Sequence, residues 1–347
     1  MRAFTIGLAV ALFAATPTAA KPSAAPAVLL RTGLTNRDPK RVDPKPAKPA
    51  TTANATTTNV ITATPAMWVV HGPRGTAYLL GSIHALPKNI DWQTPEIAAA
   101  MKRADTFVFE IPMDTESRTQ LTQMFQSNGF LPVEVSLPSY FDRQMRDNYR
   151  HVIFLTHADP TNIVYMRPWL AAMALQGAAD GETGLIAAEG VDNKVYAQAV
   201  ARGVKNFRAL ETGEFQFRLL MGDGNINEEM TRLRRTFATI IASHKDIISG
   251  LLAAWEKGDT TALATYGAGS SGMSPEYRKA FLEDRNRRWV PQIEAMLNEK
   301  HTYFITVGAG HLVGNTGVPN LLREKGYRVD GPDMIASASS SSLRALR

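Results

Sequence analysis

Between residues 66 and 330 the chain alternates short apolar runs with longer segments that carry apolar residues at helical spacing. The short runs predict strands at 67–70, 76–80, 106–111, 205–210, 302–307 and 327–329. Helices are predicted at 95–103, 117–126, 141–151, 168–176, 193–201, 227–248, 251–257, 274–298 and 318–325. Strands that alternate with helices favour an α/β fold, in which helices flank a central sheet. The helix-rich regions 117–180 and 215–300 are interpreted as helical insertions or a cap.

The two ends of the chain differ from this body in composition. Residues 1–20 combine Arg2, an apolar run and a small-residue end, which predicts a cleaved signal peptide and a periplasmic or secreted protein. The apolar run would form about 18 Å of helix, too short for the roughly 30 Å core of a membrane. Residues 21–65, rich in Pro, Ala, Thr and Lys, predict a disordered spacer, and 334–347 a low-complexity tail. The folded domain is predicted to span 66–333.

The positive charge of the protein is confined to its amino-terminal part. Of the 38 Lys and Arg residues, eight lie in residues 1–65 together with two of the 32 Asp and Glu residues, so 30 of each sign remain in the rest of the chain. The body is therefore neutral, and we expect it to bind no nucleic acid. A weak contact between the basic spacer and a membrane surface stays open.

The residue types that are absent narrow the chemistry. The chain contains no cysteine, which excludes disulfides, cysteine-ligated metals and a cysteine nucleophile. It also lacks the sequence patterns G-x-S-x-G, H-E-x-x-H and a phosphate-binding glycine loop. Histidine, carboxylates, hydroxyls and arginine remain as candidate functional groups.

Four predicted strands end at a polar residue that could reach a ligand: His84, Glu110, Glu211 and His311. In open α/β sheets ligands bind beyond the carboxyl ends of the strands, where distant segments converge. Two of these ends repeat one another, because GSIH at 81–84 and GAGH at 308–311 both follow an apolar strand. Ordinary loop histidines remain the alternative to a shared site.

The motifs YLLGSIHALP, FVFEIPMD, RPW, GVDNKVYAQAVARGVKNFRALET, DRNRRW and FITVGAGHLVGNTGVPNLLREKGYRV together resemble the TraB/GumN family, which is related to the TIKI metalloproteases. The resemblance spans about residues 67–330. It implies a central mixed sheet built from two related α/β halves and a site that contains His84, His311, Glu110 and Arg285. The resemblance also implies a manganese- or cobalt-dependent protease. One branch of the family is associated with the shutting down of a peptide pheromone.

Elementary chemistry is compatible with a divalent ion at such a site. Two neutral imidazoles and a carboxylate suit Mn, Co, Fe or Zn, with His84, His311 and Glu110 as the expected ligands. Glu110 could instead be the base that takes a proton from water. Arg285 would stabilise an oxyanion or hold a substrate carboxylate.

Three further residues are candidates for supporting roles. Asp192 fits the family pattern but is interpreted first as a helix N-cap. Glu211 either orients a histidine or pairs with an arginine, and Asn286 binds substrate or a backbone group. The remaining histidines are interpreted as incidental: His71, His151, His157, His244 and His301.

The leading hypothesis is an exported metal-dependent hydrolase of the metallopeptidase kind, acting on a peptide or protein substrate. The alternative is a non-catalytic envelope protein that binds a peptide or another ligand in the same pocket. Capture of iron or haem is a third hypothesis, and it rests on fold analogy alone.

Overall fold

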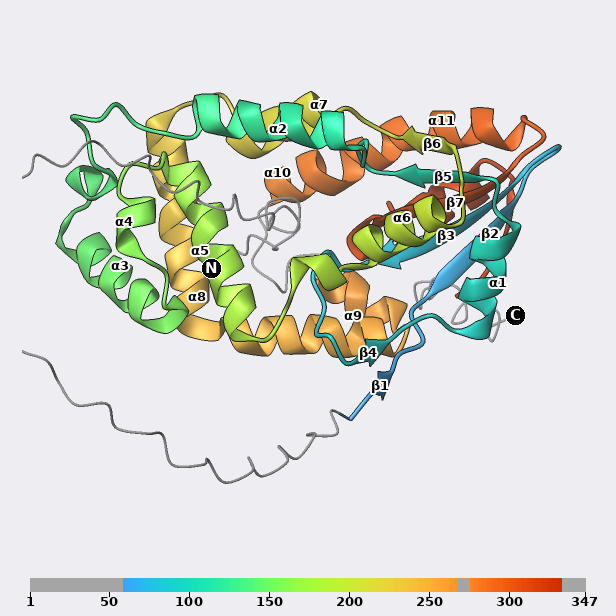
Figure 1. The fold of residues 1–347 in the computed structure, drawn as a ribbon, viewed down its shortest axis with the longest axis horizontal. Coiled ribbons are helices and arrows are strands. Elements are labelled where there is room, and N and C mark those ends of the chain that lie inside the picture. Colours follow the sequence, from blue (N-terminus) through green and yellow to red (C-terminus); the bar gives the residue numbers. More distant parts are fainter. Residues whose placement is uncertain (1–58, 267–274, 333–347) are drawn as a thin grey trace, which may run out of the picture. The chain divides into compact units, whose positions relative to one another are not determined.

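A mixed sheet forms the centre of the computed structural model, which describes residues 59–266 and 275–332 of the 347-residue chain (Figure 1). The strand order is β6-β5-β7-β3-β2-β8. These strands are β2 Met67–His71, β3 Thr76–Ser82, β5 Thr106–Phe109, β6 Asn206–Ala209, β7 Thr302–Gly308 and β8 Arg328–Asp330. A separate parallel pair consists of β1 Ile61–Thr62 and β4 Ile90–Asp91. The α/β fold with a central mixed sheet flanked by helices is confirmed.

The topology brings the two histidine motifs together. Strands β6, β5, β7 and β3 are parallel neighbours, so their carboxyl ends lie along one edge of the sheet. β3 and β7 pair directly, with Ser82 opposite Gly308 at their ends. β2 is antiparallel to β3 and to β8, and β2 and β3 form a hairpin around residues 71–75. The GSIH and GAGH sequences therefore leave neighbouring strands at the same edge.

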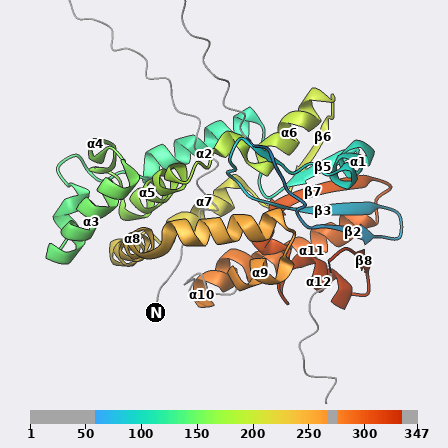
Figure 2. The same cartoon turned by 90° about the horizontal axis from the view of Figure 1, so that it is seen from below.

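Four helices cover the two faces of the sheet. α1 and α6 lie over one face, and α11 and α12 lie over the other (Figures 1 and 2). They are α1 Pro95–Arg103, α6 Val191–Ala201, α11 Asp284–Leu297 and α12 Val318–Glu324. The largest core contains Phe107 and Phe304 from the strands together with Val195 and Trp289 from the helices. β3, β5 and β7 are buried on both faces, which explains why their sequences are continuous apolar runs.

Most of the remaining helices lie to one side of the sheet (Figures 1 and 2). The remaining helices include α2 Thr115–Asn128, α3 Arg143–Thr156, α4 Pro160–Ile163, α5 Pro168–Glu182, α7 Gly213–Met221, α8 Ile226–Glu256 and α9 Thr260–Thr265. On that side α3, α4, α5 and the first part of α8 share a second core. α8 packs along α5 and α3, and this contact buries Leu175 and Phe237. α8 is the one helix among the described residues that is long and apolar enough to cross a membrane, by length and composition alone.

One predicted helix boundary was wrong. The helices predicted at 227–248 and 251–257 form the single helix α8, which runs through Gly250. Glycine serves there because a Cβ atom would lie 1.8 Å from the hydroxyl oxygen of Tyr266. The single helix predicted at 274–298 is present from Pro275 to Leu297, with a π-helical turn at Lys279–Glu283 between α10 Pro275–Arg278 and α11. Single π turns are frequent at functional sites, and this one directly precedes Arg285.

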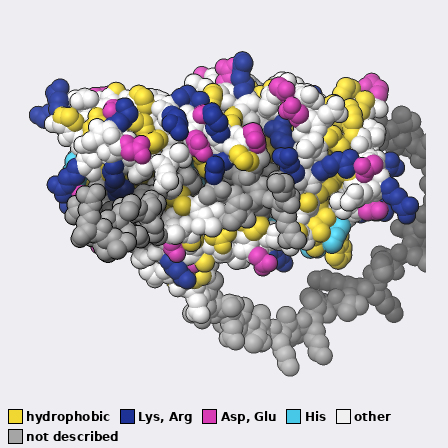
Figure 3. Space-filling view, turned by 180° about the vertical axis from the view of Figure 1, so that it is seen from behind, with side chains coloured by type: hydrophobic (Ala, Val, Ile, Leu, Met, Phe, Trp, Pro, Cys, Tyr) yellow, Lys and Arg dark blue, Asp and Glu magenta, His cyan; other side chains and the backbone are white. Residues whose placement is uncertain are grey.

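The chain ends are only partly described. The predicted signal peptide at 1–20, most of the predicted spacer at 21–65 and the predicted tail at 334–347 lie outside the described residues. β1 belongs to the segment assigned to the spacer, and Ala63 beside it is buried, so the fold reaches amino-terminal of residue 66. On the face drawn in Figure 3, basic and acidic side chains are interspersed. The absence of nucleic-acid binding stays a prediction.

Candidate functional site

His84 forms a tight pair with a carboxylate from another element. Its Nδ1 atom lies 2.7 Å from Oδ2 of Asp192, in the first turn of α6. The close approach depends on Gly190, where a Cβ atom would lie 2.1 Å from the carbonyl oxygen of His84. The interpretation of Asp192 as an N-cap was wrong, because Gly190 is the N-cap of α6 and no side chain caps it.

The electrostatic surroundings of His84 favour its protonated form. Burial alone would lower the pKa of this imidazole, but the charge and hydrogen bond of Asp192 outweigh it and raise the pKa to about 9. The nearby Glu110 carboxylate adds to the rise, and Arg285 opposes it. Nε2 of His84 is buried and has no hydrogen-bond partner, so one reactive nitrogen is left open.

Arg285 lies at the centre of a second network and is only 1% exposed. Its Nε and Nη2 atoms donate to Glu211, and Nη2 also donates to Glu110 at 2.6 Å. Its Nη1 atom donates to the carbonyl of Phe281 at 3.1 Å and to Nε2 of His311 at 3.0 Å. A guanidinium has five N–H donors, and these five bonds use all of them. In this arrangement Arg285 has no donor left for a substrate.

Glu110 and Glu211 are held as the anionic partners of Arg285. Glu110 Oε1 accepts from the backbone N–H of Gly308 at 2.8 Å, and its Oε2 also accepts from Gln216. Burial raises the pKa of Glu110, but Arg285 and the nearby histidines outweigh burial, so its pKa lies well below the usual range. Burial raises the pKa of Glu211, against the opposing effect of Arg285. Glu110 is thus a weak base in this arrangement. Of the two roles expected for Glu211, orienting a histidine or pairing with an arginine, the structure shows the pairing with Arg285.

His311 is fully buried and has both ring nitrogens engaged. Because Nε2 accepts from Arg285, the ring proton lies on Nδ1, which donates to Oδ1 of Asn286 at 2.6 Å. Burial and the Arg285 charge lower the pKa of His311 to about 3, so the ring is neutral. The Nδ2 atom of Asn286 donates to the backbone carbonyls of His311 and Thr316. Asn286 therefore orients the His311 ring and fixes the loop that follows His311 by hydrogen bonds.

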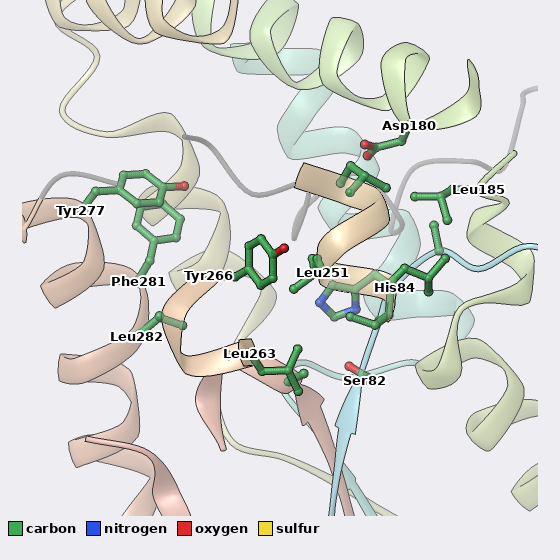
Figure 4. Close-up of a pocket in the computed structure, with 16 residues that line it drawn as sticks. Ser82, His84, Asp180, Leu185, Leu251, Leu263, Tyr266, Tyr277, Phe281 and Leu282 are labelled. Carbon is green, nitrogen blue, oxygen red and sulfur yellow. The ribbon is translucent and has the colours of Figure 1, made fainter. Parts of the chain in front are cut away.

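A pocket with a cavity volume of about 80 Å³ opens beside His84 (Figure 4). His84, Ser82 and the backbone around Gly310 line it at the edge of the sheet, and residues of α8, α9 and the π-helical turn complete it. Its walls are mostly aliphatic and aromatic. The hydroxyl of Ser82 is buried and has no hydrogen-bond partner. His311 lies outside the residues that line this pocket, so the two motif histidines have different surroundings.

The three predicted metal ligands, His84, Glu110 and His311, differ in whether their lone pairs are free. An ion needs free lone pairs on at least three converging atoms. His311 Nε2 accepts from Arg285, and Glu110 accepts three hydrogen bonds, so His84 Nε2 is the only one of the three predicted ligands without a hydrogen-bond partner. Across residues 59–266 and 275–332, no group of three His, Asp or Glu residues is arranged to hold a metal. The side chains as placed do not fit a three-ligand ion, and the metal requirement stays a prediction.

Sequence reasoning did not identify three residues at this edge. Gln216 donates to both Glu110 and Glu211 from α7, a helix that was not predicted. The Nε1 atom of Trp289 donates to Glu211, and its ring lies 4.3 Å from that of His311. Ser82 was visible inside GSIH, but no pattern distinguishes a pocket hydroxyl from an ordinary strand residue.

The protein is thus an α/β protein in which two histidines, His84 and His311, follow the adjacent parallel strands β3 and β7 of a mixed sheet. The chain is a member of the TraB/PrgY/gumN family, whose model matches residues 66–331. The resemblance stated from the motifs is thereby confirmed.

Comparison with curated proteins finds distant relatives. An uncharacterised protein of Treponema pallidum is 21% identical over 272 residues, which cover 74% of this chain and 80% of the relative. Protein YbaP of Shigella flexneri is 23% identical over 252 residues, covering 71% of this chain and 88% of YbaP. Metalloprotease TIKI1 of Danio rerio is 38% identical over 56 residues, only 16% of this chain and 11% of TIKI1. No solved structure matches.

Proposed function

We propose that this protein is an exported hydrolase that cleaves peptide bonds, with His84 as the group that transfers the proton. One observation carries the proposal: the Nε2 atom of His84 is buried and unpartnered beside an apolar pocket, while its Nδ1 atom is bonded to Asp192. A histidine oriented by a carboxylate, with its other nitrogen free, is a recurrent general base. The partial match to a relative named as a metalloprotease adds support for a peptide substrate.

The chemistry follows from this pair. In its neutral form His84 Nε2 takes a proton from a water molecule, and the oxygen of that water bonds to the substrate carbonyl carbon. Asp192 stabilises the imidazolium that forms. When the carbon–nitrogen bond breaks, the imidazolium returns the proton to the leaving amine. We assign the hydroxyl of Ser82, which lines the same pocket, as a donor to the oxyanion.

The Arg285 network lies beside the His84–Asp192 pair at the same edge of the sheet. Arg285 offsets the charges of Glu110 and Glu211, and it fixes His311 as a neutral ring at the end of β7. Because Glu110 also accepts from the backbone N–H of Gly308, these contacts fix the turn that follows β7. We therefore assign Arg285, Glu110 and His311 as positioning residues.

The metal-dependent form of the hypothesis needs a separate test. No step of this mechanism uses a metal ion, because His84 Nε2 is the only predicted ligand without a hydrogen-bond partner. A bound Mn or Co ion would require Arg285 to release His311. Elemental analysis of protein purified without chelators tests this requirement directly.

The test of function uses the purified protein and a mixture of unstructured peptides, analysed by mass spectrometry with added Mn, with added Co and with EDTA. We expect cleavage by the parent protein and at least a 100-fold loss in His84→Ala. His301→Ala is the matched control, because His301 is exposed and pairs with Asp105 before β7 begins. Equal cleavage by the parent and His84→Ala would refute the assignment.

A binding protein without turnover is the second candidate function. The apolar pocket walls and the fully occupied donors of Arg285 favour it, since both suit binding more directly than catalysis. Peptide that co-purifies with the protein and is recovered uncleaved after long incubation would favour this alternative.

A further inference from the structure

Asp180 places a carboxylate in the wall of the pocket that contains His84. It lies near the carboxyl end of α5, and it is only 7% exposed. Figure 4 shows its carboxylate at one end of the pocket, away from the His84 ring. Asp180 belongs to neither the His84 pair nor the Arg285 network.

The contacts of Asp180 involve one of its two carboxylate oxygens and include no Lys or Arg among the described residues. Its Oδ1 atom accepts from Gln176 at 3.3 Å and lies 3.1 Å from Nε2 of His244. The Nδ1 atom of His244 lies 3.0 Å from the amide nitrogen of Gln176. Among the described residues no Lys or Arg pairs with Asp180, and its Oδ2 atom has no hydrogen bond.

The rest of the pocket selects against charge and in favour of apolar groups. Its aliphatic wall comprises Leu185, Ile248, Leu251, Leu252, Leu263 and Leu282. No Lys or Arg lines it. A buried carboxylate that lacks a cationic partner is destabilising, whereas each apolar group that enters the pocket is stabilised by leaving water. A ligand with an apolar body and one positive charge satisfies both conditions.

We propose that Asp180 binds a primary ammonium group of the substrate, whose apolar body fills the pocket and whose carbonyl group reaches His84. This rests on the proposed function and gives it a substrate class: a peptide with a bulky apolar residue next to a free ammonium group. The ammonium could belong to the amino terminus of the peptide or to a lysine side chain. Both make the same ion pair with Oδ2.

The first experiment measures binding without any scissile bond. Calorimetric titration of the protein with hexylamine and with 1-hexanol compares a cation with an uncharged molecule of the same length. We expect hexylamine to bind at least about tenfold more tightly to the parent protein, equivalent to ~1.4 kcal/mol, and no such preference in Asp180→Asn. Glu182→Gln is the matched control, because Glu182 lies on the same helix, outside this pocket.

The second experiment identifies the source of the ammonium. Leucyl-leucinamide, its N-acetyl form and N-acetyl-leucyl-lysinamide are titrated, and mass spectrometry establishes whether each is recovered intact. Tighter binding of the first peptide assigns the amino terminus, and tighter binding of the third assigns the lysine side chain. Equal binding of all three peptides, or equal binding of hexylamine and hexanol, overturns the proposal.

Failure of the Asp180 assignment can be distinguished from failure of the proposed hydrolase function. Hexylamine binding does not depend on turnover, so a protein that cleaves nothing can still support the Asp180 assignment, and an active protein can still contradict it. In addition, removing an unpaired buried charge should leave the unfolding midpoint in urea unchanged or raise it in Asp180→Asn. A large fall in that midpoint would mean that Asp180 neutralises a charged His244, and this also overturns the proposal.

Discussion

Replacing Asp192 by Asn tests the electrostatic basis of the site. The substitution keeps an oxygen that can accept from His84 Nδ1 but removes the negative charge. Burial, which lowers the pKa of His84, then becomes the dominant influence, so we expect that pKa to fall from about 9 to below its ordinary value of 6.5. The parent shift corresponds to ~3 kcal/mol of preference for the protonated ring.

The assay is an NMR titration of the imidazole carbons in the two proteins between pH 5 and 10. His311 serves as an internal control, because its pKa of about 3 places it outside this range in both. A pKa near 6.5 for His84 in the parent protein, or no change in the variant, would refute the reasoning.

The same pair makes a signed contribution to stability. Because the folded-state pKa of His84 is raised, the Asp192 pair stabilises the fold fully below about pH 6.5, and this contribution is lost as the pH rises through 9. The difference in the free energy of unfolding between the parent and Asp192→Asn should shrink by up to ~3 kcal/mol over that interval. Urea unfolding at a series of pH values measures it.

Further predictions concern the neighbouring residues. Arg285→Gln leaves two buried carboxylates without their cation and should cost about 3–5 kcal/mol of unfolding free energy, measured in urea; a loss below about 1 kcal/mol contradicts the network. Gly190→Ala forces a Cβ atom against the His84 carbonyl and should destabilise by about 1–3 kcal/mol while shifting the His84 NMR signals; unchanged signals contradict the close approach. Ser82→Ala should lower kcat about 100-fold without loss of stability, and an unchanged kcat removes the assigned donor. Elemental analysis should find Mn or Co at one ion per chain if the metal-dependent form is correct, and metal-free active protein contradicts it.

The sequence predicts the centre of the sheet well because β3, β5 and β7 are buried on both faces. Runs such as residues 302–307 are apolar throughout, and this pattern depends little on distant contacts. Helix boundaries are less predictable when tertiary packing decides them. The break expected near Gly250 does not occur, since glycine is needed there to admit the Tyr266 side chain.

The sequence predicted which residues lie at the candidate site better than it predicted the contacts between them. The repeated Gly-x-x-His pattern places His84 and His311 at the same sheet edge, as the pairing of β3 with β7 shows. That His84 would pair with Asp192, 108 residues away, depends on where the first turn of α6 lies in three dimensions. The occupation of every Arg285 donor is likewise a property of packing, which no spacing in the sequence encodes.

The pH dependence of peptide cleavage tests the central claim most directly. If neutral His84 is the base, kcat/KM of the parent protein should rise about tenfold per pH unit from pH 7 and level off near pH 9. In Asp192→Asn the same rise should end below pH 6.5, with a lower maximum. A flat profile between pH 6 and 9, or identical profiles for the two proteins, would contradict the assignment of the His84–Asp192 pair.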